Sequence, residues 1–496
     1  MSFVTHLYGL FLLIVLAIYW PLRQSWLRMW ALLATSLVFY ASFQAQYIPL
    51  LLAAAWVTFL FGRAIALPLD WRTEDWDFAQ QDWNRRRLKL LWFGIVLNVL
   101  LLLGFKYIPF LLGTLSILLG LPILQQQAEW TGTHLIAPLG ISFFSFECIA
   151  YLVDVYRGAP ASQQFLQFSS YKLFFPKLIA GPITRYHAFA AQAQEQTFPQ
   201  IDRLVEGLWL IACGAVKKAL LADNLGVLVD LSFQNLQRAG SGDLWLATFT
   251  YGLQLYLDFS GYVDMARGSA ILLGFNLPRN FDFPYLTTSI ADFWRRWHMT
   301  LGDWLRNYLY FPLGGSRQGL ARTCLNLMIV MAIAGIWHGA AWGFIVWGLL
   351  HGVALVIHRL TDALSDRVHW LGLFWRSLPG VALAWLCTQL MVFTAWIFFR
   401  LPDLKESGLV VQRLLGHPAD NQFSQKVYVE AIGLQPFQIA ALLMALFGLM
   451  GLAYFVERVL KLQLNWTVKL MLVPVCLFAV WLLAPEGGVP YIYFDF

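Results

Sequence analysis

The uncharged stretch TCLNLMIVMAIAGIWHGAAWGFIVWGLLHGVALVIH, residues 323–358, decides the fold class of this chain. Its 36 residues include no Asp, Glu, Lys or Arg. A single helix of that length would be roughly 54 Å long, whereas the hydrocarbon core of a bilayer is about 30 Å thick. The stretch therefore predicts two membrane-crossing helices joined by a turn near Gly339–Gly343.

The composition of the whole chain agrees with a membrane protein. Of its 496 residues, 59% are hydrophobic and 12% are charged, whereas average soluble domains are roughly 45–50% apolar and about 25% charged. So little charge cannot cover a globule of this size, which excludes a soluble enzyme, a disordered chain and a coiled-coil rod. The net charge of +6 suits basic cytoplasmic loops and requires no nucleic-acid partner.

Apolar segments recur along the chain, and we expect an all-α polytopic protein with about eleven transmembrane helices. Residues 3–20 fit a first span, and we expect an anchor rather than a signal peptide because no positive n-region precedes it. The other candidate spans lie near 29–43, 48–67, 88–105, 107–125, 136–153, 204–221, 244–260, 323–340, 342–358, 378–399, 434–456 and 466–484.

Basic loops predict the orientation of these spans. Segments 21–28 and 68–89 carry Arg and Lys residues, whereas 44–47 carries no charge. The positive-inside rule then puts the first and third connections in the cytoplasm and the N-terminus outside. We expect one membrane-embedded domain over 1–496. Its expected parts are N-terminal helices over 1–135, a motif-bearing core over 136–360 and C-terminal helices over 361–496.

Two segments depart from simple spans. SSYKLFFPKLIAGPITRY (169–186) is too short to cross a bilayer and contains Lys177, two prolines and Gly181. It predicts a re-entrant or broken helix that is buried or lines a cavity, with a surface loop as the alternative. Residues 285–315 predict an interfacial amphipathic helix. Its apolar stripe comprises Ile290, Trp294, Trp297, Leu301, Trp304, Leu305 and Tyr308, and off the stripe lie Arg295, Arg296, Asp303, Arg306 and Asn307.

Histidines in apolar surroundings are the candidate chemical groups. His338 lies alone in AGIWHGAAWGF, where an ionisable group usually faces a cavity or a partner. A low-dielectric environment favours the neutral imidazole, which can accept a proton. A structural histidine is the alternative. His298 fits either a site residue or a polar residue at the membrane interface, and the structural interpretation is favoured for His351 and His358.

Acidic residues form the remaining class of candidates. We expect Glu147, Asp154, Asp258 and Asp264 to form structural ion pairs with nearby arginines such as Arg157, Arg267, Arg295 or Arg296, and otherwise to support the histidines or bind substrate. The sequence has no HExxH, P-loop or GxSxG motif and no metal-like cysteine cluster. We therefore expect no metal site.

Several motifs resemble the membrane-bound O-acyltransferase superfamily and, within it, the alginate O-acetylase branch. They are FPKLIAGPITRY (175–186), DFSGYVDMARGSAILLGFNLPRNFDFPYLTTSIADFWRRWHMTLGDWLRNYLYFPLGG (258–315), GIWHGAAWGFIVWGLLHG (335–352), IFFRLPD (397–403) and PYIYFDF (490–496). Departures from the family pattern at Val263, Arg267, Arg279 and Asp495 leave the acceptor open. The resemblance implies a ring of tilted helices with two funnels meeting near the family's invariant histidine, which His338 matches. His298 matches the second histidine.

The resemblance implies acyl transfer, most simply O-acetylation of an exported polysaccharide. It implies acetyl-CoA as a cytoplasmic donor substrate, no bound cofactor, and a bacterial plasma (inner) membrane location. Expected partners are membrane lipid, a periplasmic or secreted esterase-like acetyltransferase and polysaccharide export machinery. D-alanyl transfer to a cell-envelope polymer is an alternative. A proton-coupled transporter or flippase of an acyl donor and a structural scaffold are others.

Acyl transfer to a hydroxyl needs a base and the exclusion of water. We expect His338 to be the general base or to orient the reacting groups, and His298 to assist it, with an acyl-histidine intermediate left open. Trp297, Trp304 and Trp337 are expected to wall the site. The expected substrate-binding residues are Trp337, Arg295, Asn307 and Tyr310.

Overall fold

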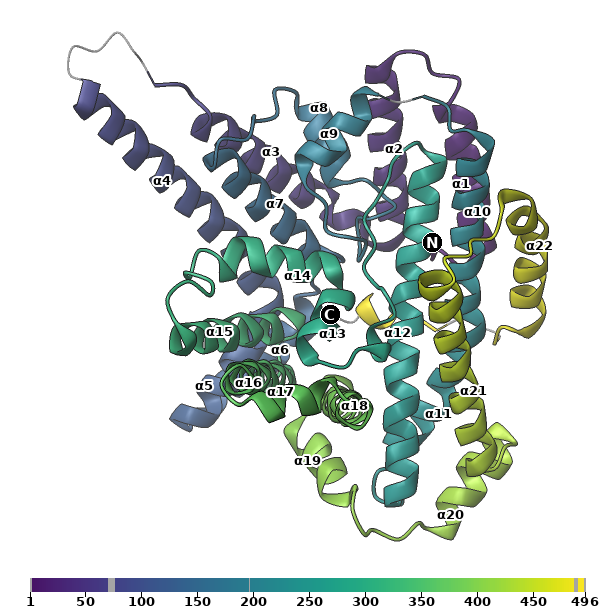
Figure 1. Ribbon diagram of the computed structural model, residues 1–496. Coiled ribbons are helices and arrows are strands. Elements are labelled where there is room, and N and C mark those ends of the chain that lie inside the picture. Colours follow the sequence, from purple (N-terminus) through teal and green to yellow (C-terminus); the bar gives the residue numbers. More distant parts are fainter. Residues whose placement is uncertain (1, 70–75, 196, 486–488, 495–496) are drawn as a thin grey trace. The chain divides into compact units, whose positions relative to one another are not determined.

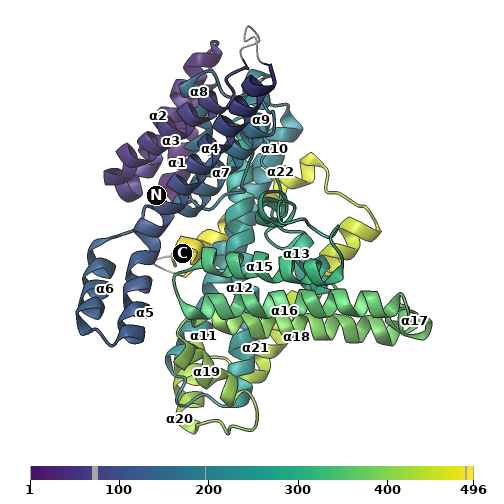
Figure 2. The same ribbon diagram turned by 90° about the vertical axis from the view of Figure 1, so that its left-hand side faces the viewer.

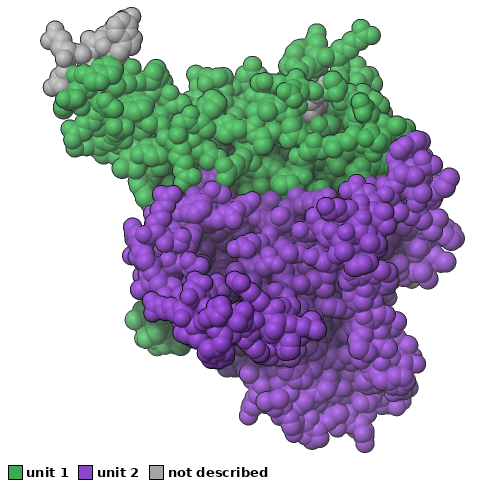
Figure 3. All heavy atoms as spheres, viewed as in Figure 1, with its two compact units in different colours: residues 1–211, 265–278 green, residues 212–264, 279–496 purple. Residues whose placement is uncertain are grey.

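The computed structural model describes residues 2–69, 76–195, 197–485 and 489–494, and within these ranges it contains helices and no strand. Arg72 of the basic loop and Asp495 of the terminal motif lie outside the described residues. The chain forms two compact units (Figure 3). The first comprises Met1–Ile211 and Met265–Pro278, and the second comprises Ala212–Asp264 and Arg279–Phe496.

The first unit is built from helices that pack along one another, with α3, α4 and α7 in contact (Figure 1) and α5 and α6 forming a hairpin (Figure 2). Helix α7 is buried along almost its whole length. The helices are α1 (His6–Tyr19), α2 (Ser25–Gln44), η1 (Ala45–Tyr47), α3 (Ile48–Ile65), α4 (Trp76–Leu102), η2 (Leu103–Tyr107), α5 (Ile108–Leu119), α6 (Pro122–His134), α7 (Ile141–Tyr156), α8 (Phe165–Lys172) and α9 (Tyr186–Gln194).

Two helices continue from one unit into the other, α10 (Ile201–Ala215) and α12 (Ser241–Leu272). The second unit also contains η3 (Val216–Ala222), α11 (Asp223–Gln234), η4 (Pro284–Leu286), α13 (Ile290–Arg296), α14 (Met299–Leu305), η5 (Arg306–Tyr310), α15 (Leu320–His338), α16 (Trp342–Ser365), α17 (His369–Arg376), α18 (Leu378–Arg400), α19 (Leu404–Arg413), α20 (Asn421–Phe423), η6 (Ser424–Ile432), α21 (Pro436–Tyr454), η7 (Phe455–Val459), α22 (Trp466–Leu483) and η8 (Ile492–Phe494).

Helices α15, α16 and α18 lie side by side in the second unit (Figure 2). Gly335 and Gly348 lie at the crossing of α15 and α16, where a Cβ on Gly335 would be 2.3 Å from the Phe344 carbonyl oxygen. Glycine at this position therefore allows the two backbones to touch, as small residues do between membrane helices. This contact sets the register of the two helices that 323–358 was expected to form.

Seven helical stretches in the described residues are long and apolar enough to cross a membrane. Two of them run through consecutive helices, Ser25–Ile65 and Trp76–Leu119. The others are Leu320–His338, Trp342–Ser365, Leu378–Arg400, Pro436–Val459 and Trp466–Leu483, and the shorter apolar helix His6–Tyr19 accompanies them. These stretches confirm an all-α polytopic membrane protein.

The region 285–315 differs from the continuous amphipathic helix that its stripe predicted. The chain leaves the helical conformation at Trp297 and His298, so the region consists of η4, α13, α14 and η5. Asn280 stabilises the break, because its carbonyl accepts from the Met299 N–H (2.9 Å) and its side-chain oxygen accepts from the N–H and hydroxyl of Thr300 (3.1 and 2.7 Å). The break turns His298 into the interior of the second unit.

Candidate functional site

His338 is the last residue of α15 and is buried, with 3% of its surface exposed. The chain is extended at Gly339 and becomes helical again at Trp342, so the turn lies where the sequence predicted it. Aromatic rings surround the imidazole. Their centroids lie 4.8 Å (Trp337), 4.9 Å (Trp347), 5.1 Å (Phe399) and 6.1 Å (Tyr493) from that of His338.

His298 joins α13 to α14 and is completely buried. It adopts a left-handed conformation (φ 44°, ψ 54°), which is uncommon for a residue with a side chain and is enriched at functional sites. Burial lowers the pKa of this histidine, which lies outside the membrane-spanning stretches, to about 3. His298 is therefore neutral near pH 7, and its burial excludes an exposed residue at the membrane interface.

The two histidines share neighbours within the second unit. The Trp337 ring lies 6.3 Å from His298 and 4.8 Å from His338, and the Tyr493 ring lies 6.0 and 6.1 Å from them. Trp297 and Trp304 are also buried. The structure thus brings together the two residues predicted to be catalytic, in an interior made mainly of aromatic rings.

Tyr493 is the site residue that sequence reasoning missed. It belongs to η8 in the C-terminal segment, and its ring stacks on Phe259 of α12 with centroids 3.8 Å apart. The available signal was the cluster of aromatic residues in PYIYF, which is apolar enough to be buried. Nothing in the pattern of the sequence placed this segment beside the histidines.

A buried ion cluster anchors the C-terminal segment. The Lys218 ammonium contacts Asp258 (2.5 Å) and Asp223 (2.8 Å) and donates to the Pro490 carbonyl (3.1 Å), while the Ile492 N–H donates to Asp258 (3.1 Å). The side chains of Lys218, Asp223 and Asp258 are at most 3% exposed. These contacts hold the segment that places Tyr493 beside the two imidazoles.

The expected ion pairs of α12 exist, and lysines are among their partners. Asp258 pairs with Lys218, and Asp264 pairs with Lys217 at 2.6 Å. Gly261 allows this pairing, because a Cβ there would lie 3.1 Å from the Lys217 side chain and from the backbone nitrogen of Lys218. The close approach of η3 to α12 at this glycine brings both lysines to the two carboxylates.

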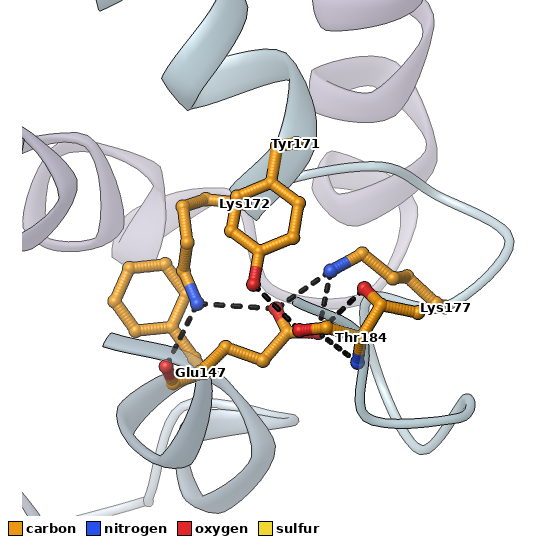
Figure 4. Close-up of polar contacts among 6 residues, drawn as sticks. Glu147, Tyr171, Lys172, Lys177 and Thr184 are labelled. Atoms are coloured by element: carbon orange, nitrogen blue, oxygen red, sulfur yellow. Dashed lines mark hydrogen bonds and ion pairs between the residues drawn. The ribbon is translucent and has the colours of Figure 1, made fainter. Parts of the chain in front are cut away.

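The first unit contains the broken segment that the sequence predicted. Residues 173–182 are non-helical and entirely buried, so the segment is not a surface loop. Glu147 of α7 holds it, because the carboxylate contacts the ammonium groups of Lys177 (2.5 Å) and Lys172 (3.2 Å) and accepts from the N–H of Thr184 (3.0 Å; Figure 4). The cluster contains two buried cations and one buried carboxylate. The cluster stabilises an irregular segment whose backbone polar groups are not paired within a helix, for example by accepting from the Thr184 N–H.

The four predicted substrate-binding residues differ in burial and in the residues that they contact. Trp337 is buried beside both histidines. Arg295 is exposed, and Asn307 donates to the Asp303 carbonyl at 2.7 Å within its own helical segment. Tyr310 ends η5, with its ring 6.0 Å from that of Phe311. Substrate binding by these residues stays a prediction. Of the four, Trp337 is the one whose ring contacts both histidines.

The fold and the site together define a class of protein, a multi-pass helical membrane protein with two buried histidines in one aromatic interior. The membrane-bound O-acyltransferase (MBOAT) family profile matches residues 37–398. The peptidoglycan O-acetyltransferase of Helicobacter pylori is 34% identical over 416 residues, which cover 78% of this chain and 74% of the relative. The chain belongs to the membrane-bound O-acyltransferase family, and the protein is an O-acyltransferase.

Other relatives differ in the group that their names say they transfer. The probable alginate O-acetylase of Pseudomonas aeruginosa is 36% identical over 445 residues, covering 89% of this chain and 80% of its own. The teichoic acid D-alanyltransferase of Streptococcus thermophilus is 30% identical over 261 residues, covering 49% of this chain and 62% of its own.

Proposed function

We propose that the protein transfers an acetyl group from a cytoplasmic donor, across the membrane, for O-acetylation of an exported polysaccharide. One observation carries this proposal: two buried histidines share Trp337 and Tyr493 as neighbours in an aromatic interior. Such an interior excludes water, which would otherwise hydrolyse an activated acyl group. It also keeps imidazole neutral and able to accept a proton.

The proposed reaction needs one base. A hydroxyl oxygen attacks the carbonyl carbon of a thioester, His338 removes the hydroxyl proton, and the carbon–sulfur bond breaks. The proton then passes from His338 to the departing thiolate, so that the imidazole is neutral again after each turnover. General base catalysis of this kind contributes about 10²–10⁴-fold to a rate.

His298 and Tyr493 act on the same reacting groups. Because burial lowers the pKa of His298 to about 3, it serves as a neutral hydrogen-bonding group rather than as a cation. The ring of Tyr493 lies against both imidazoles, so its hydroxyl is a further polar group of the site. We propose that both orient the thioester and the attacking hydroxyl.

The donor and the partners follow from the same scheme. Acetyl-CoA is the proposed donor substrate, and neither a resident cofactor nor a metal is part of the chemistry. The proposed location is the inner membrane of a bacterium, where an esterase-like transferase on the far side and export machinery would complete delivery to the polymer. This separation suits a multi-pass protein whose reacting groups are buried within the chain.

Acetyl transfer is favoured over D-alanyl transfer by the extent of the similarity. The peptidoglycan O-acetyltransferase and the alginate O-acetylase described above align with 78% and 89% of this chain, whereas the D-alanyltransferase aligns with 49%. A transporter that moves an acyl donor intact transfers no acyl group, so it would not need a general base. It would be favoured if the purified protein moved acetyl-CoA across liposomes without cleaving it.

Composition analysis of surface glycans tests the proposal. Glycans are isolated from cells with the gene, without it and with it restored, and alkali-released acetate and D-alanine are measured. We expect deletion to remove acetate, restoration to return it, and D-alanine to be unchanged. Unchanged acetate would contradict the proposal, and selective loss of D-alanine would establish the alternative transfer.

A further inference from the structure

His351 is a third buried histidine whose proton position is fixed by a neighbour. It lies in α16 with none of its surface exposed, and the Trp294 indole N–H donates to its Nδ1 at 3.3 Å. An indole N–H can only donate, so Nδ1 must be the accepting, unprotonated nitrogen. The neutral imidazole therefore carries its proton on Nε2.

The Nε2–H donor has no acceptor among the described residues. The rings around the imidazole belong to Trp347 (4.9 Å), Trp294 (5.2 Å), Phe293 (6.1 Å) and Trp396 (6.1 Å), none of which offers a strong acceptor. The indole N–H of Trp347 also lacks an acceptor in the described part of the chain. Buried donors without acceptors cost free energy, so two of them on one helix point to an occupant that supplies oxygen.

These donors lie beside the reacting histidine. The Trp347 ring centroid is 4.9 Å from His338 and 4.9 Å from His351, so a single indole touches both imidazoles. The close contact of α15 and α16 at Gly335 and Gly348 keeps this arrangement fixed. His338 and the two donors of α16 thus belong to one cluster of rings.

We propose that the Nε2–H of His351 donates a hydrogen bond to the carbonyl oxygen of the donor's thioester and so positions it for reaction. The acceptor is a neutral oxygen, because an anion buried among aromatic rings without a cation would be strongly unfavourable. This inference rests on the proposed function for the identity of the thioester. It gives His351 a positioning role, in place of the structural role that its sequence position favoured.

The proposal is tested by comparing two coenzyme A derivatives, one with the thioester carbonyl and one without it. Binding of acetyl-CoA and of S-ethyl-CoA, which lacks the carbonyl, is measured with the full chain in lipid nanodiscs. The wild-type protein is compared with His351→Leu, which removes the donor, and with His351→Gln, which keeps an N–H donor. One neutral hydrogen bond corresponds to about a tenfold preference for acetyl-CoA.

We expect the wild-type protein and His351→Gln to prefer acetyl-CoA and His351→Leu to lose that preference. If His351→Leu fails to fold, Trp294→Phe replaces it, because loss of the indole N–H frees the tautomer and should reduce the preference partly. Equal binding of the two coenzyme A derivatives by the wild-type protein, or a preference that survives in His351→Leu, would overturn the inference. A purely structural histidine, or one bound to water, gives the second of these results.

The same measurement separates this inference from the proposed function. A protein that shows the His351-dependent preference but acetylates no glycan would refute the function and leave the carbonyl contact intact. A protein that acetylates glycan without such a preference would refute only the contact.

Discussion

At the scale of single residues, Tyr493 is the neighbour of the two histidines that the structure reveals. Tyr493→Phe should keep the ring stacked on Phe259 and remove the hydroxyl, lowering acetyl transfer about tenfold or more if that group orients the reacting atoms. The measurement is alkali-released glycan acetate at equal protein levels.

Tyr491→Phe is the matched control for this prediction. Its ring lies against Tyr262 and 4.7 Å from the Lys218 ammonium, and the substitution also removes one phenolic hydroxyl from the C-terminal segment. We expect nearly normal acetylation in this variant. Full activity of Tyr493→Phe, or equal losses in both variants, would show that the Tyr493 hydroxyl has no special role.

His298 gives a prediction about pH. Its pKa is lowered to about 3, so protonation of His298 becomes appreciable only as the pH falls toward that value. We expect His298→Asn to lower the initial rate of transfer from labelled acetyl-CoA by no more than loss of His338 does. The shape of the rate profile between about pH 5 and 8 should stay the same. A shift of the acid limb in this variant would mean that His298 titrates in the working range.

At the scale of elements, the broken segment after α8 depends on its buried charges. Glu147→Gln leaves Lys172 and Lys177 without their carboxylate, and breaking such a buried pair costs about 3–5 kcal/mol. We expect this variant to accumulate poorly and to melt at a lower temperature in detergent.

The double variant Glu147→Gln/Lys177→Gln is the informative comparison. It has the same net charge in the cluster as the wild-type protein and should recover about 1–3 kcal/mol of the loss. Thermal unfolding followed by size-exclusion chromatography measures both variants. A double variant no more stable than Glu147→Gln would show that the carboxylate acts through its bond to Thr184 and not through the lysines.

The crossing of α15 and α16 makes another prediction at this scale. Gly335→Ala would place a Cβ 2.3 Å from the Phe344 carbonyl, so the helices must separate. Overpacking of this kind typically costs about 1–3 kcal/mol, and here it also shifts His338 relative to Trp347. We expect a lower melting temperature and a larger loss of acetylation.

Gly448→Ala in α21 is the control for that substitution. Nothing else in the described part of the chain lies within 4 Å of a Cβ at Gly448, and alanine favours a helix over glycine by about 1 kcal/mol. Its stability should be unchanged or higher. If both variants behaved alike, the contact of α15 with α16 would not determine the geometry around His338.

At the scale of the whole molecule, much of the fold follows from where charge is absent. The uncharged run 323–358 predicted two helices and the turn after His338, since its length exceeds one bilayer crossing. The break at His298 could not be predicted, because a left-handed residue with a side chain has no signature in the apolar stripe. Asn280, which precedes this region in the sequence, stabilises the break by accepting hydrogen bonds from Thr300.

The site was predictable only in part, because contacts between distant segments leave no signal in the local sequence pattern. Histidines stand out in apolar surroundings, so His338 and His298 could be found from composition and motif. The Tyr493 ring, the lysine partners of Asp258 and Asp264, and the indole that fixes His351 depend on contacts between segments far apart in the chain. Periodicity reports which face of a helix is apolar, but not what lies against it.

The central claim is that acyl transfer takes place at His338. Its most direct test is His338→Ala, produced at the wild-type level in the membrane of cells that lack the native gene, with alkali-released acetate measured on the exported glycan. Our account predicts complete loss of acetate while the protein remains folded and inserted, because the substitution removes the proposed base. Acetylation at the wild-type level in this variant would contradict the account.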